Sequence, residues 1–387
     1  MVSGNTDKNI LYIITGLSTG GAEMALFNLL QGGLDERFSC HVVSLSNEGT
    51  MGAKIKALGI PVTTLGMRRG LPSFSGLNTL RTLVREFKPD IIQGWMYHGN
   101  LVATLARRMA SGAPCLVWNI RQSLYELNNE KFLTRQVIRL NRFFSTGVNA
   151  LLYNSQLSQK QHEALGFSAT ESRVLPNGID VRKYLFSNSH RKKVRSELDV
   201  SDDAIIVGHV ARFHPMKDHQ LFIKAAVKIA RGNAHIYFLL SGRNVLLENE
   251  DIARLIPTEL SDRFFFLGER NDISELMCAM DVLCLSSAWG EGFPNVIGEA
   301  MAIGLPCVAT DVGDSGIIIA DTGLIVPART EDKLISGIEK LVMMSHQERR
   351  SLGEKAHVRI NDNYKLSAIV DRYTSLYKQL LDVKRER

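Results

Sequence analysis

Short apolar runs alternate with amphipathic stretches along most of the chain, and this alternation predicts strands separated by helices. In the first half, strands are predicted over residues 10–15, 39–45, 62–65, 91–95, 115–119, 148–153 and 172–175. The pattern restarts in the second half, with strands predicted over residues 204–212, 235–241, 264–267, 281–285, 306–309 and 323–326. Strands that alternate with helices indicate an α/β protein with doubly wound parallel sheets.

The length of 387 residues exceeds what one ordinary core needs and predicts two domains. A turn at Asn177-Gly178 and the charged, irregular segment that follows place the boundary near residue 187. We therefore expect an amino-terminal domain over residues 1–187 and a carboxy-terminal domain over residues 188–363. Apolar residues at helical spacing predict a long terminal helix over residues 364–387.

The segment after the predicted strand 281–285 combines a tight loop with the start of a helix. Glycines on both sides of Glu291 permit a sharp turn, Pro294 suits the first turn of a helix, and residues 295–302 read as that helix. Free N–H groups at a helix start favour phosphate, whereas Glu291 and Glu299 are acceptors for hydroxyl groups. Together these groups indicate a nucleotide sugar, although either glutamate alone is also typical of an ordinary surface charge.

A pair of cations flanks the turn after the predicted strand 204–212. Arg212 and Lys217 are separated by four residues, so both could reach a diphosphate that lies over the turn. The alternative is that Lys217 is a solvated charge beside Asp218, which would cap the next helix.

Other candidate residues follow predicted strands of the first half. Gly20 and Gly21 lie in a glycine-rich loop that lacks the Gly-x-Gly-x-x-Gly dinucleotide fingerprint. His98 follows the strand 91–95, where a histidine can serve catalysis or simply form surface hydrogen bonds. Arg121 follows the strand 115–119 and could hold an acidic acceptor group or form a structural salt bridge.

These motifs, in this order, resemble the large family of retaining glycosyltransferases with the GT-B fold, usually called family 4. The resemblance covers nearly the whole chain. It implies two Rossmann-like domains that face an interdomain cleft, and a terminal helix that crosses back to the first domain.

The resemblance also implies roles for individual residues. Arg212 and Lys217 would bind the diphosphate, Glu291 the donor sugar and Glu299 the ribose, while His98 would face the donor sugar or the acceptor. The rest of the expected donor site comprises Gly20, Gly21, Gly292, Phe293, Pro294, Asn295, Val296, Arg243 and Leu267. The expected acceptor site comprises Arg121 and Asn177.

The expected reaction moves a hexose or N-acetylhexosamine from a nucleoside diphosphate sugar, by default a UDP-sugar, to a hydroxyl of a lipid-linked oligosaccharide or polysaccharide precursor. By resemblance it retains anomeric configuration, with the leaving phosphate taking the acceptor proton. No Asp-x-Asp motif stands at a predicted strand end, so we expect neither a metal ion nor another cofactor. The alternatives are a nucleotide-sugar epimerase of the same fold and a non-catalytic nucleotide-sugar-binding protein.

The net charge of +6 favours acidic partners, namely nucleotide phosphates or anionic lipids. Nucleic acid is not expected, because no zinc finger, RNA-binding motif or dense basic run occurs. Lys131, Arg135, Arg139 and Arg142 form a basic stripe beside apolar positions at helical spacing. This pattern over residues 131–142 fits a helix on an anionic membrane surface or a core helix with a solvated outer face.

The sequence predicts a cytoplasmic protein, with contact to the inner face of the cytoplasmic membrane as an open alternative. The first nine residues are polar and do not resemble a signal or transit peptide. No apolar run approaches the ~18–20 residues that span a bilayer. The five cysteines form no Cys-x-x-Cys pair and read as small core residues in a reducing compartment.

Overall fold

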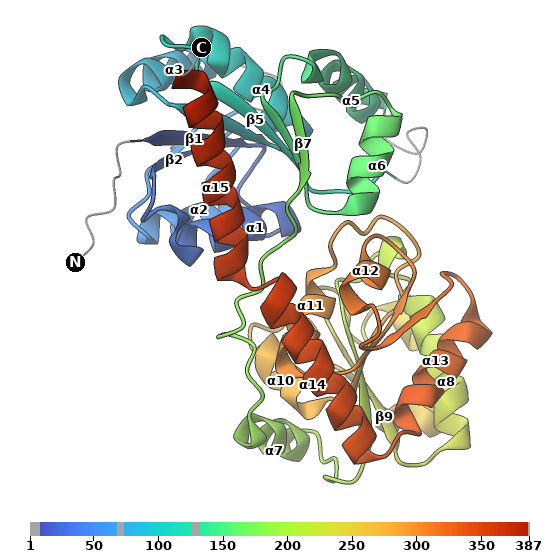
Figure 1. The fold of residues 1–387 in the computed structure, drawn as a ribbon. Coiled ribbons are helices and arrows are strands. Elements are labelled where there is room, and N and C mark those ends of the chain that lie inside the picture. Colours follow the sequence, from blue (N-terminus) through green and yellow to red (C-terminus); the bar gives the residue numbers. More distant parts are fainter. Residues whose placement is uncertain (1–7, 68–72, 125–131, 386–387) are drawn as a thin grey trace. The chain divides into compact units, whose positions relative to one another are not determined.

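The computed structural model describes residues 8–67, 73–124 and 132–385. Its contacts divide the chain into two compact units (Figure 1). Unit 1 comprises Met1–Gly178 with Leu366–Arg387, and unit 2 comprises Ile179–Lys365. The division thus falls after residue 178, before the charged segment at which the sequence analysis placed it.

Unit 1 is built on a seven-stranded parallel sheet with the strand order β3-β2-β1-β4-β5-β6-β7. The strands are β1 (Asn9–Ile14), β2 (Ser39–Ser44), β3 (Val62–Thr64), β4 (Ile91–Trp95), β5 (Cys115–Ile120), β6 (Ala150–Tyr153) and β7 (Glu171–Val174). The helices are α1 (Gly21–Leu29), α2 (Gly49–Ala57), α3 (Phe74–Phe87), α4 (Met96–Met109), α5 (Phe132–Ser145), α6 (Gln156–Ala164) and α15 (Leu366–Arg385), with a π-helical segment at Leu30–Leu34.

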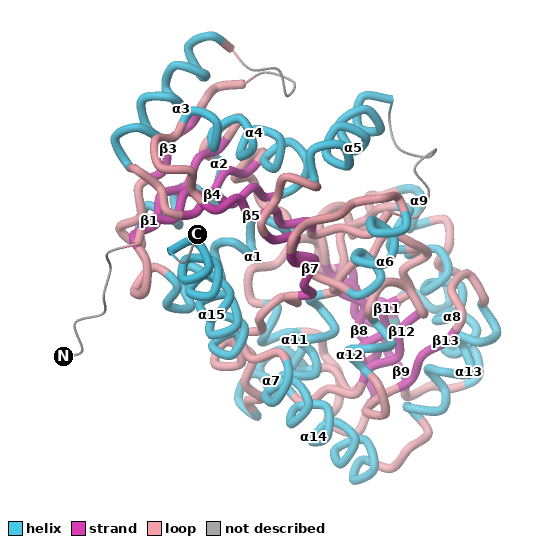
Figure 2. Tube along the Cα trace, turned by 45° about the horizontal axis from the view of Figure 1, so that its top comes forward, coloured by secondary structure: helices cyan, strands magenta, loops and turns pink. Residues whose placement is uncertain are grey.

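Both faces of this sheet are buried, as the continuous apolar runs of its strands require. Along β1, Ile10 and Tyr12 point into one core cluster together with residues of α1, α2 and α15. Leu11 and Ile13 point into the opposite cluster, with residues of α3, α4 and α5. The two groups of helices accordingly cover opposite faces of the sheet, as Figure 2 shows.

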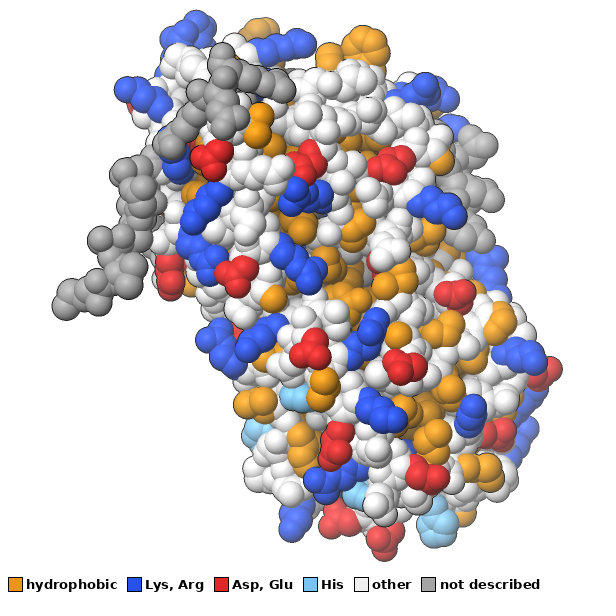
Figure 3. All heavy atoms as spheres, in the orientation of Figure 1, with side chains coloured by type: hydrophobic (Ala, Val, Ile, Leu, Met, Phe, Trp, Pro, Cys, Tyr) orange, Lys and Arg blue, Asp and Glu red, His pale blue; other side chains and the backbone are white. Residues whose placement is uncertain are grey.

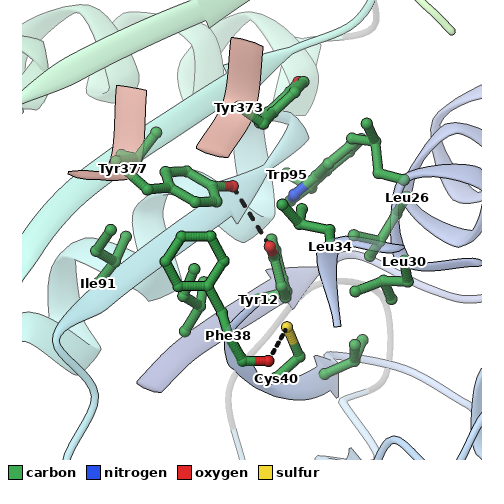
Figure 4. Close-up of a cluster of buried hydrophobic side chains, with 14 of the residues drawn as sticks. Tyr12, Leu26, Leu30, Leu34, Phe38, Cys40, Ile91, Trp95, Tyr373 and Tyr377 are labelled. Atoms are coloured by element: carbon green, nitrogen blue, oxygen red, sulfur yellow. Dashed lines mark hydrogen bonds between the residues drawn. The ribbon is translucent and has the colours of Figure 1, made fainter. Parts of the chain in front are cut away.

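The terminal helix α15 is part of the core of unit 1. Tyr373 and Tyr377 are fully buried, and both side chains project from α15 into the cluster around Tyr12 and Phe38 (Figure 4). The hydroxyls of Tyr12 and Tyr377 are 3.4 Å apart, and Tyr377 also donates to Gln93 on β4. The last segment of the chain therefore completes the fold of the first domain.

Unit 2 repeats the architecture with a six-stranded parallel sheet in the order β10-β9-β8-β11-β12-β13. The strands are β8 (Ile205–Val210), β9 (Ile236–Ser241), β10 (Phe264–Phe266), β11 (Val282–Leu285), β12 (Cys307–Thr310) and β13 (Leu324–Val326). The helices are α7 (Asn188–Glu197), α8 (His219–Gly232), α9 (Glu250–Ala253), α10 (Ile273–Ala279), α11 (Asn295–Ile303), α12 (Ser315–Ile319), α13 (Glu331–Val342) and α14 (His346–Asn363), with short 3₁₀ segments at Pro215–Lys217 and Thr258–Arg263.

The fold class predicted from the sequence is confirmed, because both units are doubly wound parallel sheets. Each predicted strand is present with ends displaced by a few residues; the strand predicted over 204–212 ends at Val210, so Arg212 lies in the following loop. Within the described residues, no helix is long and apolar enough to cross a membrane.

The strand order reverses once in each sheet, between β1 and β4 in unit 1 and between β8 and β11 in unit 2. At such a reversal the two neighbouring loops diverge and leave a crevice at the carboxyl ends of the strands, where ligands of α/β proteins bind. The topology therefore points to the loops after β1, β4, β8 and β11.

Candidate active site

Lys217 and Glu291 meet at the point of strand reversal in unit 2. Lys217 ends the 3₁₀ turn after β8, and Glu291 lies in the loop after β11. The Lys217 ammonium forms an ion pair with the Glu291 carboxylate, and their side chains are only 14% and 8% exposed. Lys217 is therefore not a solvated charge, although Asp218 does cap α8 by accepting from the Leu221 N–H.

A second hydrogen bond holds the Glu291 carboxylate in place. The Ser287 hydroxyl donates to Glu291 Oε1 over 2.5 Å, and the Thr310 hydroxyl donates to the Ser287 carbonyl over 2.6 Å. Glu291 is thus held by residues of the loops after β8 and β11, and the last residue of β12 supports Ser287. The sequence analysis missed Ser287, whose only signal is its position directly after an apolar strand.

The loop around Glu291 packs tightly against the loop that carries Lys217. The Ala288 N–H donates to the Met216 carbonyl over 2.8 Å. Gly290 has φ of +79°, and a Cβ atom there would lie 2.5 Å from Met216 Sδ. Only glycine satisfies both the backbone angle and the close approach.

A buried hydrogen-bond network holds the backbone of Lys217. Ser286 Oγ lies 2.9 Å from the carbonyl oxygen of Lys217 and 3.1 Å from that of Asp218. His209 on β8 places Nε2 3.1 Å from the same hydroxyl. Burial lowers the pKa of His209 well below its usual value, so the ring is neutral.

Arg212, Arg243 and Leu267 lie in the loops after β8, β9 and β10, and backbone hydrogen bonds link these loops side by side. The Phe213 N–H donates to the Arg243 carbonyl over 2.8 Å, and the Gly242 N–H donates to the Gly268 carbonyl over 2.8 Å. The structure therefore brings the three residues to the same edge as Lys217. Arg212 is exposed, and it has no ion pair with any acidic residue in the described part of the chain.

Helix α11 begins at Asn295, as predicted, but Pro294 occupies the N-cap position with φ of −73° and not the first turn. Phe293 is buried, with its ring centroid 5.4 Å from that of Tyr364. Its side chain therefore serves the core of unit 2, and only its backbone is placed to serve a ligand. Asn295 and Val296 follow as the first residues of the helix.

Glu299 lies on α11 and is partly exposed, but protein surrounds its carboxyl group. Burial raises the pKa of this group to about 7, against the opposing effect of a hydrogen bond with Tyr184. Burial and the Glu299 charge raise the pKa of the Tyr184 hydroxyl in turn. The sequence analysis missed Tyr184, which comes from the segment just after residue 178 and carries no motif.

In unit 1, Gly20, Gly21 and His98 lie at the reversal between β1 and β4. Gly20 caps α1 and Gly21 begins it, and a Cβ atom at Gly21 would meet nothing within 4 Å. His98 lies in the first turn of α4, and burial lowers the pKa of its ring, which is therefore neutral at pH 7. A Cβ atom at Gly99 would lie 2.4 Å from the Ile13 carbonyl, so only glycine lets this turn contact β1.

Arg121 and Asn177 are joined by a hydrogen bond between guanidinium and amide oxygen. Arg121 is only 8% exposed, lies 4.9 Å from the ring centroid of Trp95 and is 3.1 Å from the Tyr373 hydroxyl. The salt bridge that the sequence left open is absent within the described residues, since the hydrogen-bond partners of Arg121 are neutral. The acceptor-binding role of both residues stays a prediction.

The basic stretch forms α5, except that Lys131 lies outside the described residues. Ile138 is buried in the core of unit 1, and Val137 and Phe144 pack against that core. Leu133 and Leu140 are exposed. The apolar positions at helical spacing therefore divide between the core and the surface.

Comparisons with known proteins agree with this geometry. A family profile described as "Glycosyltransferase Family 4" matches residues 19–183, and one described as "Glycosyl transferases group 1" matches residues 204–343. EpsF of Bacillus subtilis, named as a glycosyltransferase, is 27% identical over 320 residues, which is 79% of this chain and 80% of EpsF.

Further relatives are similar in sequence or in structure. The Escherichia coli UDP-Gal:alpha-D-GlcNAc-diphosphoundecaprenol alpha-1,3-galactosyltransferase is 23% identical over 313 residues, covering 79% of this chain and 80% of that protein. The crystal structure of Anabaena HepE in complex with UDP superposes with a TM-score of 0.82 and 24% identity, covering 96% of this chain and 100% of HepE. The two profiles together span most of the chain, each over one of its two Rossmann-like domains, and the protein therefore belongs to glycosyltransferase family 4 with the GT-B fold.

Proposed function

We propose that the protein transfers a hexose or N-acetylhexosamine from a UDP-sugar to a hydroxyl of a lipid-linked oligosaccharide or polysaccharide precursor, with retention of configuration and without a metal ion. The observation that carries the proposal is the Lys217–Glu291 ion pair at the strand reversal of unit 2. In this pair a cation suited to phosphate lies beside a carboxylate suited to accept hydrogen bonds from sugar hydroxyls. Arg212 adds a second cation on the same edge, which forms no ion pair with the residues that the structure describes.

The chemistry follows from where charge develops. The bond between the anomeric carbon and the diphosphate oxygen breaks, so negative charge accumulates on the leaving UDP. Lys217 and Arg212 stabilise that charge more strongly in the transition state than in the bound donor. The acceptor oxygen attacks the same face of the anomeric carbon, and its proton passes to the departing phosphate oxygen.

Carboxylates hold the sugars at the two ends of the donor. Glu291, fixed by Ser287, accepts hydrogen bonds from the transferred sugar. Glu299 accepts hydrogen bonds from the ribose hydroxyls when it is ionised. Backbone groups from Gly292 to Val296 complete the sugar pocket.

Unit 1 supplies the acceptor side of the proposal. The neutral His98 ring can accept or donate a hydrogen bond to the acceptor hydroxyl. Gly20 and Gly21 would let the donor diphosphate and the acceptor approach the backbone, and a Cβ atom at Gly21 would meet nothing within 4 Å. Arg121 and Asn177 would hold an acidic group of the acceptor.

The names of the relatives support the choice of donor and acceptor. The Escherichia coli relative is named for UDP-galactose and a diphosphoundecaprenol-linked sugar, and another relative is named as a lipopolysaccharide core mannosyltransferase. Crystal structures of HepE contain UDP and UDP-glucose. A lipid-linked acceptor would bring this enzyme to the inner face of the cytoplasmic membrane.

The donor is identified first, by thermal-shift screening against UDP-, GDP- and ADP-sugars, because a ligand of the folded state raises the unfolding temperature. Transfer is then measured as the amount of nucleoside diphosphate released in the presence of acceptor. Lys217→Ala should lower kcat by roughly 10²–10³, the usual cost of removing one group that stabilises transition-state charge. Lys228→Ala removes an exposed cation of α8, the helix that follows Lys217, and should leave kcat unchanged.

The same assay tests the other parts of the proposal. Glu291→Ala should abolish transfer, whereas the exposed Glu339→Ala should not. Activity lost on addition of a chelator would contradict the metal-independent mechanism. An epimerised nucleotide sugar formed without acceptor, or donor binding with no turnover under any condition, would overturn the transferase proposal.

A further inference from the structure

The side of α5 that faces away from the core of unit 1 is apolar. Four large side chains are exposed there: Phe132 by 64%, Leu133 by 74%, Leu140 by 49% and Phe143 by 73%. Their spacing along the helix places all four on one side, since positions seven, eight and eleven residues apart share a face. The buried residues Ile138, Asn141 and Ser145 occupy the opposite side.

This exposure sets α5 apart from the other helices. In the described part of the chain, no other helix carries more than one exposed large hydrophobic residue. The outer side of a helix in a soluble protein is normally polar, and a contiguous exposed apolar surface marks a site of interaction. In Figures 1 and 2, α5 lies at the outside of unit 1 beside α4.

The charges next to this apolar side all have one sign. Arg135, Arg139 and Arg142 recur every three or four residues and form a stripe along one flank, and α5 contains no acidic residue. None of the three has an ion pair within the described residues. By contrast, basic and acidic side chains are interspersed over the face drawn in Figure 3.

We propose that α5 docks on an anionic lipid bilayer, with Phe132, Leu133, Leu140 and Phe143 inserted at the level of the acyl chains and the three arginines at the lipid phosphates. Unpaired cations flanking an apolar side match a surface whose phosphates lie above hydrocarbon. Arg135 lies 5.9 Å from the Phe132 ring centroid, so its charge can remain at the headgroups while the ring is buried.

A protein partner fits the same surface less well, because it would have to supply an acidic rim to match the arginines. The inference rests on the proposed function in one respect, namely that a lipid-linked acceptor places the reaction at a bilayer. Docking itself requires no catalysis and can be measured without substrates.

The test is flotation of the full-length protein with vesicles of phosphatidylcholine, alone or mixed with phosphatidylglycerol. We expect binding to the anionic vesicles, weakened at about 1 M salt, where charges are screened beyond a few ångströms. Phe132→Ser/Phe143→Ser and Arg139→Glu/Arg142→Glu should each lower the vesicle-bound fraction by roughly tenfold or more.

Two matched variants serve as controls. Met343→Ser removes a hydrophobic side chain that is 82% exposed in unit 2. Arg372→Glu reverses an exposed charge on α15, which packs on the opposite face of the unit 1 sheet. Both controls should bind vesicles as the unaltered protein does.

The inference is overturned if the unaltered protein does not float with anionic vesicles or if the α5 variants bind as well as the controls. It is also overturned if the protein is a dimer that Phe132→Ser/Phe143→Ser converts to monomers while vesicle binding is unchanged. Transfer to a water-soluble acceptor analogue should survive in the α5 variants. Loss of docking with intact transfer would therefore be distinguishable from failure of the proposed function.

Discussion

Glu299 is a carboxyl group that takes up a proton close to neutral pH. Its pKa is raised from 4.5 to about 7, chiefly by burial. The folded protein therefore binds this proton more tightly than the unfolded chain does. Its contribution to stability falls as the pH rises from about 4.5 to about 7, and is constant above that window.

This titration predicts pH-dependent donor binding. A protonated carboxyl has lost part of its capacity to accept hydrogen bonds from ribose, so the affinity for UDP-glucose should rise roughly tenfold between pH 6 and pH 8 and then level off. Calorimetric titration with UDP-glucose measures the change. Glu299→Gln has no titratable carboxyl at this position, so its affinity for UDP-glucose should not change with pH. If the affinity of this variant changes with pH as in the unaltered protein, another group causes the pH dependence.

At the scale of elements, the loop that carries Lys217 is held by residues from the two strands at the sheet reversal, β8 and β11. Ser286, directly after β11, contacts the backbone of Lys217, while His209 of β8 contacts the Ser286 hydroxyl. Two adjacent strands thus fix the loop that carries the cation. The Ser286 hydroxyl thus positions the backbone of Lys217.

Ser286→Ala should therefore lower kcat by roughly tenfold, a cost of about 1.4 kcal/mol in the transition state, with little change in KM for the donor. Ser286→Thr keeps the hydroxyl and should recover most of the rate. Steady-state kinetics with both variants measure the effect. Because His209 is neutral across the working range, the pH–rate profile of Ser286→Ala should keep the shape of the parent profile. Equal losses in both variants, together with a lowered unfolding temperature, would instead indicate a purely structural serine.

At the scale of the whole molecule, the last helix of the chain completes the first domain. Tyr377 is fully buried and hydrogen-bonds Gln93 of β4. Tyr377→Ala leaves a cavity and an unpaired amide, and should destabilise unit 1 by about 3–5 kcal/mol. Hydrogen exchange should show the loss of stability in unit 1. UDP-glucose binding should be preserved, because the proposed donor residues lie chiefly in unit 2. Val383→Ser, on the exposed side of the same helix, should have little effect.

Several features could be predicted from the sequence because their causes are local. Strand and helix positions follow from hydrophobic periods of a few residues, so the seven strands of one sheet and the six of the other lie close to their predicted positions. The Glu291 loop and the Lys217 turn were recognisable from short motifs whose glycine, proline and charge placement is local. The sequence determines the end of a strand less well. Arg212, for example, was predicted to end a strand but lies in the loop after β8.

Other features depended on contacts between distant segments. Strand order sets β8 beside β11, and only that pairing brings Lys217 to Glu291 across 74 residues of chain. The supporting hydroxyls of Ser286 and Ser287 and the contact of Tyr184 with Glu299 arise in the same way.

The sequence by itself determined the elements, the number of sheets and the types of residue at the strand ends, because these follow from local periodicity and turn chemistry. Only the tertiary structure decided which side of α5 is covered and whether Arg121 has an acidic partner. Helical periodicity shows that apolar positions share a side, but burial depends on which neighbouring elements pack against that side.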